Sequence, residues 1–149
     1  MNNSSEEPLG RLLSLTTKVV QQDFDLRLAA YGGGLTTFLV LKYALEGEGL
    51  TTQRALARGM GIEAPTLVRH IDRLELEGYV ERRRDEQDRR AVRVVVTPAG
   101  KKLWSRLVEG MAAANGELVG LLTANEERVL RRALTKVRTH YTTKREEGA

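Results

Sequence analysis

The 149-residue sequence contains no cysteine, which excludes disulfides, thiolate metal ligands and redox sensing by thiols. Its two histidines, His70 and His140, lie far apart and outside any spacing typical of a zinc site. No serine stands in a Gly-x-Ser-x-Gly motif, and no glycine-rich phosphate loop is present. We therefore expect neither an enzyme nor a protein with a metal or other cofactor.

Long apolar runs are also missing, since none approaches the roughly 20 residues that a membrane-spanning helix needs. The first residues, MNNSSEEPLGRLL, lack the basic and then apolar pattern of a secretory signal. We expect a cytoplasmic protein with no membrane partner. Only 5% of the residues are aromatic, yet 41% are hydrophobic, which is enough to form a core.

Positive charge is concentrated in one segment of the chain. The formal net charge is only +4. The stretch RRRDEQDRRAVR, from Arg82 to Arg93, has six arginines against three acidic residues, an excess of +3. Because these arginines lie on both sides of an acidic turn, the pattern predicts a basic β-hairpin.

Helical spacing and glycine stops predict two helices in the first third of the chain. The first extends from Glu6 to Tyr31, with Ser4 and Glu7 as a capping box, and ends at the three glycines 32–34. The second extends from Leu35 to Leu45 and ends in the sequence EGEG.

A helix-turn-helix is predicted next. Thr51 is the expected N-cap of a short helix, and RGMGI supplies the glycine-containing turn. The second helix starts near Glu63 to Pro65 and ends before Gly78. Leu67, Ile71 and Leu74 recur at i, i+4 and i+7 and should face the core, which leaves the opposite face exposed.

Two strands and two further helices complete the expected elements. An extended run begins at 79–83, and 91–96 is the clearest strand because its valines alternate. Thr97 and Pro98 form an N-cap and first-position pair for a helix that should continue to about Leu122. The segment TANE, at 123–126, reads as a capping box for a final amphipathic helix.

These elements predict a mainly α fold with a small β wing, a winged helix-turn-helix core flanked by N- and C-terminal dimerisation helices. We assign 1–34 to an N-terminal dimerisation helix, 35–97 to the winged core and 98–149 to C-terminal dimerisation helices. The apolar stripes of the flanking helices exceed what one small winged core can cover. A symmetric homodimer is therefore expected, with paired recognition helices about 34 Å apart.

The sequence at this point resembles the MarR family of bacterial regulators. The matching pieces are LTTQRALARGMGI, TLVRHIDRLELEG and DRRAVRVVVTPAGKKL, which follow one another between Leu50 and Leu103. The last contains the Asp-x-Arg, apolar strand and Thr-x-x-Gly turn of that family's wing. The segment GIEAPTLVRHIDRLELEG is closer still to the SlyA-like branch, whose recognition helix starts with Pro-Ser-Leu-Val-Arg where this chain has PTLVR.

The resemblance implies that the wing-tip arginine, which reaches the minor groove, is Arg90, with Arg89 as a second basic contact. Asp88 would brace the Arg90 guanidinium, and its alternative role is that of a solvated turn carboxylate. A guanidinium is weakly hydrated, so it enters a narrow AT-rich groove at lower cost than an ammonium. Three preceding arginines are expected to neutralise phosphates: Arg82, Arg83 and Arg84.

For the recognition helix, Arg69 is the best candidate to read a base, because a bidentate contact with guanine is common in the major groove; its alternative is a phosphate contact. His70 is either a groove contact or a solvated residue. Arg73 contacts phosphate or forms an ion pair with Glu77. The predicted major-groove set is Pro65, Thr66, Val68, Arg69, His70 and Arg73.

Members of this family commonly bind aromatic acids or phenols in a cleft between the dimerisation helices and the winged core. The resemblance places the lining residues on Phe38 and Lys42, one helical turn apart, with Tyr43 and Trp104 as weaker candidates. Alternatively, Phe38 is a core residue and Lys42 a solvated lysine.

Together, these features predict a regulator of transcription that binds double-stranded DNA at a pseudopalindromic, AT-rich operator and is released by small aromatic carboxylates or phenols. Two alternatives stay open. One is a winged-helix module that docks its arginines on an acidic protein surface. The other is a nucleoid-type or anti-silencing DNA binder with weak sequence preference.

Overall fold

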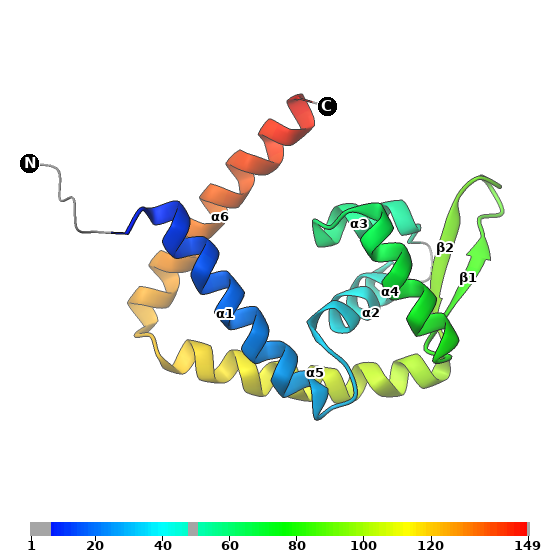
Figure 1. Cartoon of the computed structure of the whole chain (residues 1–149), viewed down its shortest axis with the longest axis horizontal. Coiled ribbons are helices and arrows are strands. Elements are labelled where there is room, and N and C mark those ends of the chain that lie inside the picture. Colours follow the sequence, from blue (N-terminus) through cyan, green and yellow to red (C-terminus); the bar gives the residue numbers. More distant parts are fainter. Residues whose placement is uncertain (1–6, 48–50, 149) are drawn as a thin grey trace, which may run out of the picture. The chain divides into compact units, whose positions relative to one another are not determined.

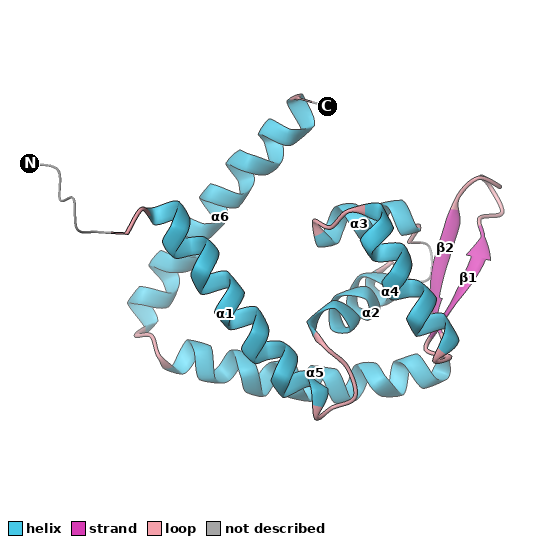
Figure 2. Cartoon of the chain, in the orientation of Figure 1, coloured by secondary structure: helices cyan, strands magenta, loops and turns pink. Residues whose placement is uncertain are grey.

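The computed structural model describes residues 7–47 and 51–148, and over these residues it contains six helices and one two-stranded antiparallel sheet (Figures 1 and 2). The predicted fold class, mainly α with a small β wing, is confirmed. The elements in chain order are α1 (Leu9–Ala29), α2 (Leu35–Glu46), α3 (Gln53–Met60), α4 (Ala64–Leu76), β1 (Val80–Arg84), β2 (Val92–Val96), α5 (Pro98–Gly120) and α6 (Ala124–Glu147).

The chain divides into two compact units, Met1–Met111 and Ala112–Ala149, and α5 runs from the first into the second. The predicted division at 34/35 and 97/98 into functional segments stays a prediction. In the part of the chain that is described, no helix is both long and apolar enough to cross a membrane.

The core of the first unit is built on apolar spacing in α2, α4 and the wing. Leu67, Ile71 and Leu74 of α4 are each at most 1% exposed, as the i, i+4, i+7 pattern predicts. They pack with buried residues from every other element of this unit, namely Leu28, Val40, Leu41, Ala44, Leu56, Ala57, Val80, Val94, Val96, Leu103 and Leu107.

Two expected helix starts are corrected by the structure. Pro8 occupies the N-cap of α1, so the helix begins at Leu9, later than predicted, and Glu7 precedes it. Ser4 and Glu6, named in the prediction, lie outside the described residues. The N-cap of α3 is Thr52 and not Thr51, since Thr52 Oγ1 accepts a hydrogen bond from the backbone N–H of Ala55 at 3.1 Å.

The turns on both sides of α4 use left-handed glycines, as expected. Gly61, at φ +66°, ends α3, and Gly78, at φ +78°, follows α4. After Gly78 the chain enters β1, whose residues pair with β2 in the register Val80↔Val96 to Arg84↔Val92. The wing is therefore connected to α4 by a single short turn.

The start of α5 is held against the base of the wing. Thr97 donates its hydroxyl to the Gly78 carbonyl at 2.6 Å and accepts the backbone N–H of Gly100 at 3.1 Å. An added Cβ on Gly100 would lie 2.1 Å from the Tyr79 carbonyl oxygen. The close approach of two backbones explains the glycine in the Thr-x-x-Gly turn.

In the second unit, the predicted capping box of α6 is confirmed. Thr123 Oγ1 accepts the backbone N–H of Glu126 at 3.3 Å, and the Glu126 carboxylate accepts the Thr123 N–H at 2.8 Å. The apolar face of this helix is open to solvent: Val129, Leu130, Leu134, Val137 and Tyr141 are each at least 38% exposed.

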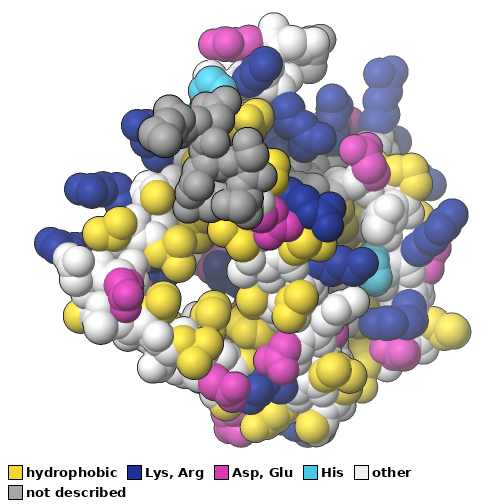
Figure 3. Space-filling model, turned by 60° about the vertical axis from the view of Figure 1, so that its left-hand side comes forward, with side chains coloured by type: hydrophobic (Ala, Val, Ile, Leu, Met, Phe, Trp, Pro, Cys, Tyr) yellow, Lys and Arg dark blue, Asp and Glu magenta, His cyan; other side chains and the backbone are white. Residues whose placement is uncertain are grey.

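Helix α1, in the first unit, also exposes large apolar side chains. Leu9, Leu12, Leu15, Val19 and Leu26 are each at least 41% exposed. Figure 3 shows apolar side chains in yellow that are open to solvent on one face of the molecule. Exposed apolar stripes of this size are typical of surfaces that a partner covers.

Candidate nucleic-acid interface

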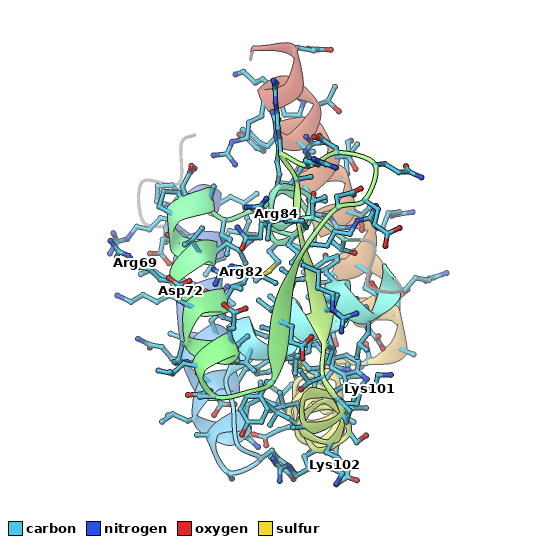
Figure 4. All side chains as sticks on the ribbon, turned by 90° about the vertical axis from the view of Figure 1, so that its right-hand side faces the viewer. Arg69, Asp72, Arg82, Arg84, Lys101 and Lys102 are labelled. Atoms are coloured by element: carbon cyan, nitrogen blue, oxygen red, sulfur yellow. The ribbon has the colours of Figure 1, made fainter. Side chains whose placement is uncertain are left out.

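Helix α4 presents one anchored face and one open face. Its three buried residues, Leu67, Ile71 and Leu74, fix its rotation against the core. Arg69 lies on the opposite face, and Figure 4 shows it directed away from the protein. The Arg69 side chain makes no ion pair or hydrogen bond within the described residues, so its five N–H donors can all meet a ligand.

The first turns of α4 present the other predicted contacts. Pro65 and Thr66 are exposed, and Val68 is 36% exposed. Pro65 occupies the first turn, where a missing N–H costs nothing. These residues surround the positive end of the helix, where a phosphate is favoured.

His70 and Arg73 lie at the edge of the open face and turn toward the start of α2. Arg73 Nη2 donates to Thr37 Oγ1 at 3.2 Å, and Arg73 Nε lies 3.8 Å from a Glu77 carboxylate oxygen. His70 is half-buried and lines a cleft with Thr37 and Arg73. Burial, and then the charge of Arg73, lower the pKa of His70, so the imidazole is neutral at neutral pH.

The turn of the wing is organised by Asp85. Its carboxylate accepts the backbone N–H groups of Gln87 at 2.7 Å and Asp88 at 3.1 Å, and it pairs with the Arg93 guanidinium. These two backbone hydrogen bonds, and then Arg93, lower the pKa of Asp85. Asp85 is buried and stays ionised, so it fixes the conformation of the wing tip.

The wing-tip arginines are Arg89 and Arg90, and both are exposed. Asp88 Oδ1 accepts the backbone N–H of Arg90 at 3.0 Å. The expected brace on the Arg90 guanidinium is therefore replaced by a contact with the Arg90 backbone, because a side chain two residues away reaches the turn amide first. Asp88 shapes the turn and leaves the guanidinium free in the described structure.

The three arginines of β1 differ in their environment. Arg84 is exposed, and Arg83 forms an exposed pair with Glu81 at 2.9 Å. Arg82 instead points toward Asp72 of α4, with only 23% of its side chain exposed (Figure 4). The expectation that all three neutralise phosphates thus does not fit Arg82, whose charge is already paired within the protein.

Recognition helix and wing border a common cleft. It is lined by Val68 of α4, by Gln53 and Arg54 of α3, and by Asp88 and Arg90 of the wing. The elements expected to enter the major and minor grooves are thus adjacent, and two arginines, Arg54 and Arg90, are among the residues that line the cleft.

The predicted effector residues make contacts of their own. Phe38 packs on the core and stacks with Trp104, with ring centroids 4.9 Å apart. Lys42 Nζ lies 3.6 Å from a Glu46 carboxylate oxygen and 5.5 Å from the centre of the Tyr43 ring. These contacts are those of a core aromatic and a paired lysine, and an effector site at Phe38, Lys42 and Tyr43 stays a prediction.

Sequence reasoning missed the internal partners of the basic residues: Asp85 for Arg93, and Gln53, Asp72 and Glu75 for Arg82. One signal was available. Arg82 shares a strand face with Val80 two residues earlier, and Val80 is buried, so strand alternation already directs Arg82 inward. Among the described residues, no group of three or more histidine, aspartate or glutamate side chains is placed to hold a metal ion.

Comparison with known proteins shows which family this geometry is similar to. Residues 35–92 match the model of the MarR family. A MarR transcriptional regulator from Methanosarcina mazei Go1 is 27% identical, with 91% of this chain and 96% of that chain covered and a TM-score of 0.78. A mutant MarR from E. coli, in complex with operator DNA, is 27% identical, with 87% and 93% covered and a TM-score of 0.79.

CouR from Rhodococcus jostii RHA1, bound to p-coumaroyl-CoA, is also 27% identical, with 88% of this chain and 92% of that chain covered and a TM-score of 0.76. These structures span the helices on both sides of the core as well as the core itself. Residues 35–92 therefore match a MarR family domain, and the chain has the winged-helix fold of these MarR regulators.

Proposed function

We propose that this protein is a cytoplasmic transcription regulator that binds double-stranded DNA sequence-specifically as a homodimer and belongs to the SlyA-like branch. The observation that carries the proposal is the adjacency of two basic elements. Unpaired Arg69 lies on the open face of α4, and exposed Arg90 lies on a wing whose tip shares a cleft with α4. This arrangement suits a helix in the major groove and a wing in the minor groove.

Within this proposal, each of the two basic elements has a separate task. Arg69 reads a base, while Pro65, Thr66 and Val68 contact thymine methyls or phosphates around the helix start. Arg89 and Arg90 enter the minor grooves that flank the site, which favours an AT-rich, pseudopalindromic operator. His70 and Arg73, at the edge of α4, contribute less to recognition because they face Thr37.

Selection of bound sites from random duplexes tests the proposal. We expect two related half-sites about one helical turn apart, and Arg90→Ala should weaken binding to the selected site by about 1–3 kcal/mol. If Arg90→Ala binds the selected site with full affinity, Arg90 at the tip of the wing does not contribute to DNA binding. Failure of the wild-type protein to bind any duplex at low salt, together with capture of acidic proteins, would favour the protein-interaction module instead.

The homodimer rests on the exposed apolar stripes of α1 and α6, which a second copy of the chain would bury. Leu134→Glu places a charge in the α6 stripe and should convert dimer to monomer in sedimentation equilibrium. Lys136→Glu, on the opposite side of the same helix, is the matched control and should leave the dimer intact. A wild-type protein that sediments as a monomer at micromolar concentration would contradict the proposal.

The most detailed part of the proposal is an effector site at Phe38, Lys42 and Tyr43. An aromatic carboxylate would stack beside Phe38 and pair with the Lys42 ammonium. Salicylate and benzoate should weaken binding to the selected duplex, and Lys42→Met should reduce that response while leaving DNA affinity without ligand unchanged. If salicylate and benzoate weaken duplex binding equally in Lys42→Met and in the wild type, the effector does not bind at this site.

A further inference from the structure

Arg82 connects three elements through one guanidinium. Its Nη2 lies 2.6 Å from Asp72 Oδ1, its Nη1 lies 2.7 Å from Glu75 Oε2, and its Nε donates to Gln53 Oε1 at 2.6 Å. Asp72 and Glu75 belong to α4, and Gln53 begins α3. All three guanidinium nitrogens of a wing residue are therefore occupied by both helices of the helix-turn-helix.

The backbone of Arg82 strengthens this connection. Its N–H donates to Glu75 Oε1 at 2.9 Å, so the two oxygens of one carboxylate receive the backbone and the side chain of the same residue. These hydrogen bonds, the backbone one first, lower the pKa of Glu75 and keep it ionised. A two-point contact of this kind fixes both the position and the rotation of α4 relative to β1.

We propose that Arg82 is a positioning residue that sets the recognition helix against α3 and the wing, and that it is not a phosphate contact. The inference rests on the proposed DNA-binding function. A phosphate could reach the guanidinium only by displacing an ionised carboxylate or the Gln53 amide oxygen. Lysine, a point charge without a planar fork, cannot satisfy the same three acceptors.

The position of Asp72 explains why this matters for reading DNA. Asp72 follows Arg69 by three residues, so the two lie on neighbouring positions of the same helix face. Fixing Asp72 to β1 therefore fixes the direction in which Arg69 projects. The same strand continues to the wing tip, so one node of hydrogen bonds sets the geometry of both groove contacts.

The two possible roles of Arg82, phosphate contact and positioning residue, predict opposite changes in DNA affinity when Asp72 and Glu75 are removed. If Arg82 contacted phosphate, removal of two nearby carboxylates in Asp72→Ala/Glu75→Ala would free the guanidinium and strengthen DNA binding. If Arg82 positions α4, the same double variant breaks the node and weakens binding, although it makes the surface more positive. The sign of the effect therefore separates the two roles.

The experiment measures affinity for the selected duplex and for a random duplex of equal length, over a range of salt concentrations. Arg82→Met and Asp72→Ala/Glu75→Ala should each lose about tenfold or more on the selected duplex and less than about threefold on the random one, because non-specific binding depends on phosphate contacts alone. Arg82→Lys keeps the charge and should show the same loss of preference for the selected duplex over the random one.

Arg84→Met is the matched control, since Arg84 is exposed on the same strand. It should weaken binding to both duplexes and lower the salt slope by about 0.9. Arg82→Met should leave the slope close to that of the wild type. Tighter binding by Asp72→Ala/Glu75→Ala, or a loss of slope in Arg82→Met like that of Arg84→Met, would overturn the proposal.

A second measurement needs no DNA and separates failure of this inference from failure of the proposed function. In an NMR titration of the folded protein, the pKa of Glu75 should be below the ordinary glutamate value in the wild type and should rise in Arg82→Met. The rise is partial, because the backbone N–H of residue 82 still donates to Glu75 in this variant. An unchanged pKa would show that the Arg82 guanidinium does not hold Glu75. If the wild type selects no duplex but the pKa of Glu75 rises in Arg82→Met, the contact between Arg82 and Glu75 is confirmed and the proposed DNA-binding function is wrong.

Discussion

Gly100 offers a sharp test of how the wing is attached to the protein. An alanine Cβ here would lie 2.1 Å from the Tyr79 carbonyl oxygen and 2.7 Å from Val96 Cγ1, well inside the 3.0 Å below which real Cβ atoms are essentially never found. The carbonyl cannot easily withdraw, because it accepts the backbone N–H of Thr97 at 3.1 Å. Gly100→Ala must therefore push α5 away from the base of the wing.

Two opposing contributions decide whether Gly100→Ala raises or lowers the free energy of unfolding. Replacing a helical glycine with alanine gains about 1 kcal/mol from helix propensity. Overpacking typically costs about 1–3 kcal/mol, and a clash with backbone belongs at the upper end of that range. We expect Gly100→Ala to lower the free energy of unfolding by about 2 kcal/mol. Gly116, in the same helix with nothing within 4 Å of an added Cβ, should instead gain about 0.5–1 kcal/mol on substitution with alanine.

Urea unfolding followed by circular dichroism measures both variants. Protein concentrations must be equal, because the proposed dimer would make the midpoint depend on concentration. Opposite shifts of the midpoint, with Gly100→Ala below and Gly116→Ala above the wild type, are the expected result. A Gly100→Ala protein as stable as the wild type would refute the close packing of α5 against the turn after α4.

Two further predictions concern side chains that organise the interface. Asp85→Asn should destabilise the wing at neutral pH. Because the pKa of Asp85 is lowered in the folded state, the wild type should be more stable than the variant above the pH at which an unfolded aspartate titrates, and this difference should disappear as the pH falls through the folded-state pKa. Unfolding of both proteins from pH 7 to pH 2 measures the difference. Thr52→Ala should lower the unfolding free energy by about 1 kcal/mol through loss of the α3 cap, as urea unfolding would measure.

Most of the fold follows from rules that act over a few residues. The spacing of Leu67, Ile71 and Leu74 places α4 against the core, and the pair Thr123 and Glu126 marks the start of α6. Glycine at position 78 marks the exit from α4 because its φ is positive. Each of these signals is contained in a short sequence window, so a single sequence is enough to find it.

The choice between Thr51 and Thr52 shows where such rules end. Both are suitable N-caps by type, and they are adjacent. The structure uses Thr51 elsewhere: its carbonyl accepts the backbone N–H of Val94 at 3.1 Å, and its hydroxyl donates to the Tyr43 carbonyl at 3.3 Å. The cap is thus decided by contacts outside the local pattern, one of them with Val94, which is more than forty positions away.

The arginines show the same limit at the candidate site. In sequence they form one basic cluster, but the structure divides them by their partners. Arg82 is held by α3 and α4, and Arg93 is held by the buried Asp85. Long-range contacts decide these assignments, and only strand alternation from buried Val80 gave a hint that Arg82 turns inward.

This division changes what the wing can contribute to binding. If all five arginines neutralised phosphates, the salt slope for one copy of the chain would be about 4.5, at about 0.9 per phosphate; the five are Arg82, Arg83, Arg84, Arg89 and Arg90. With Arg82 paired to α4 and Arg83 to Glu81, three free guanidiniums remain, which corresponds to roughly 2.7. The wing therefore has less non-specific attraction than its composition suggests. Arg82 instead ties β1, the strand that leads to the wing tip, to α4, the helix that carries Arg69. Under the proposed function, a fixed spacing of these two elements favours discrimination between sequences over attraction to any DNA.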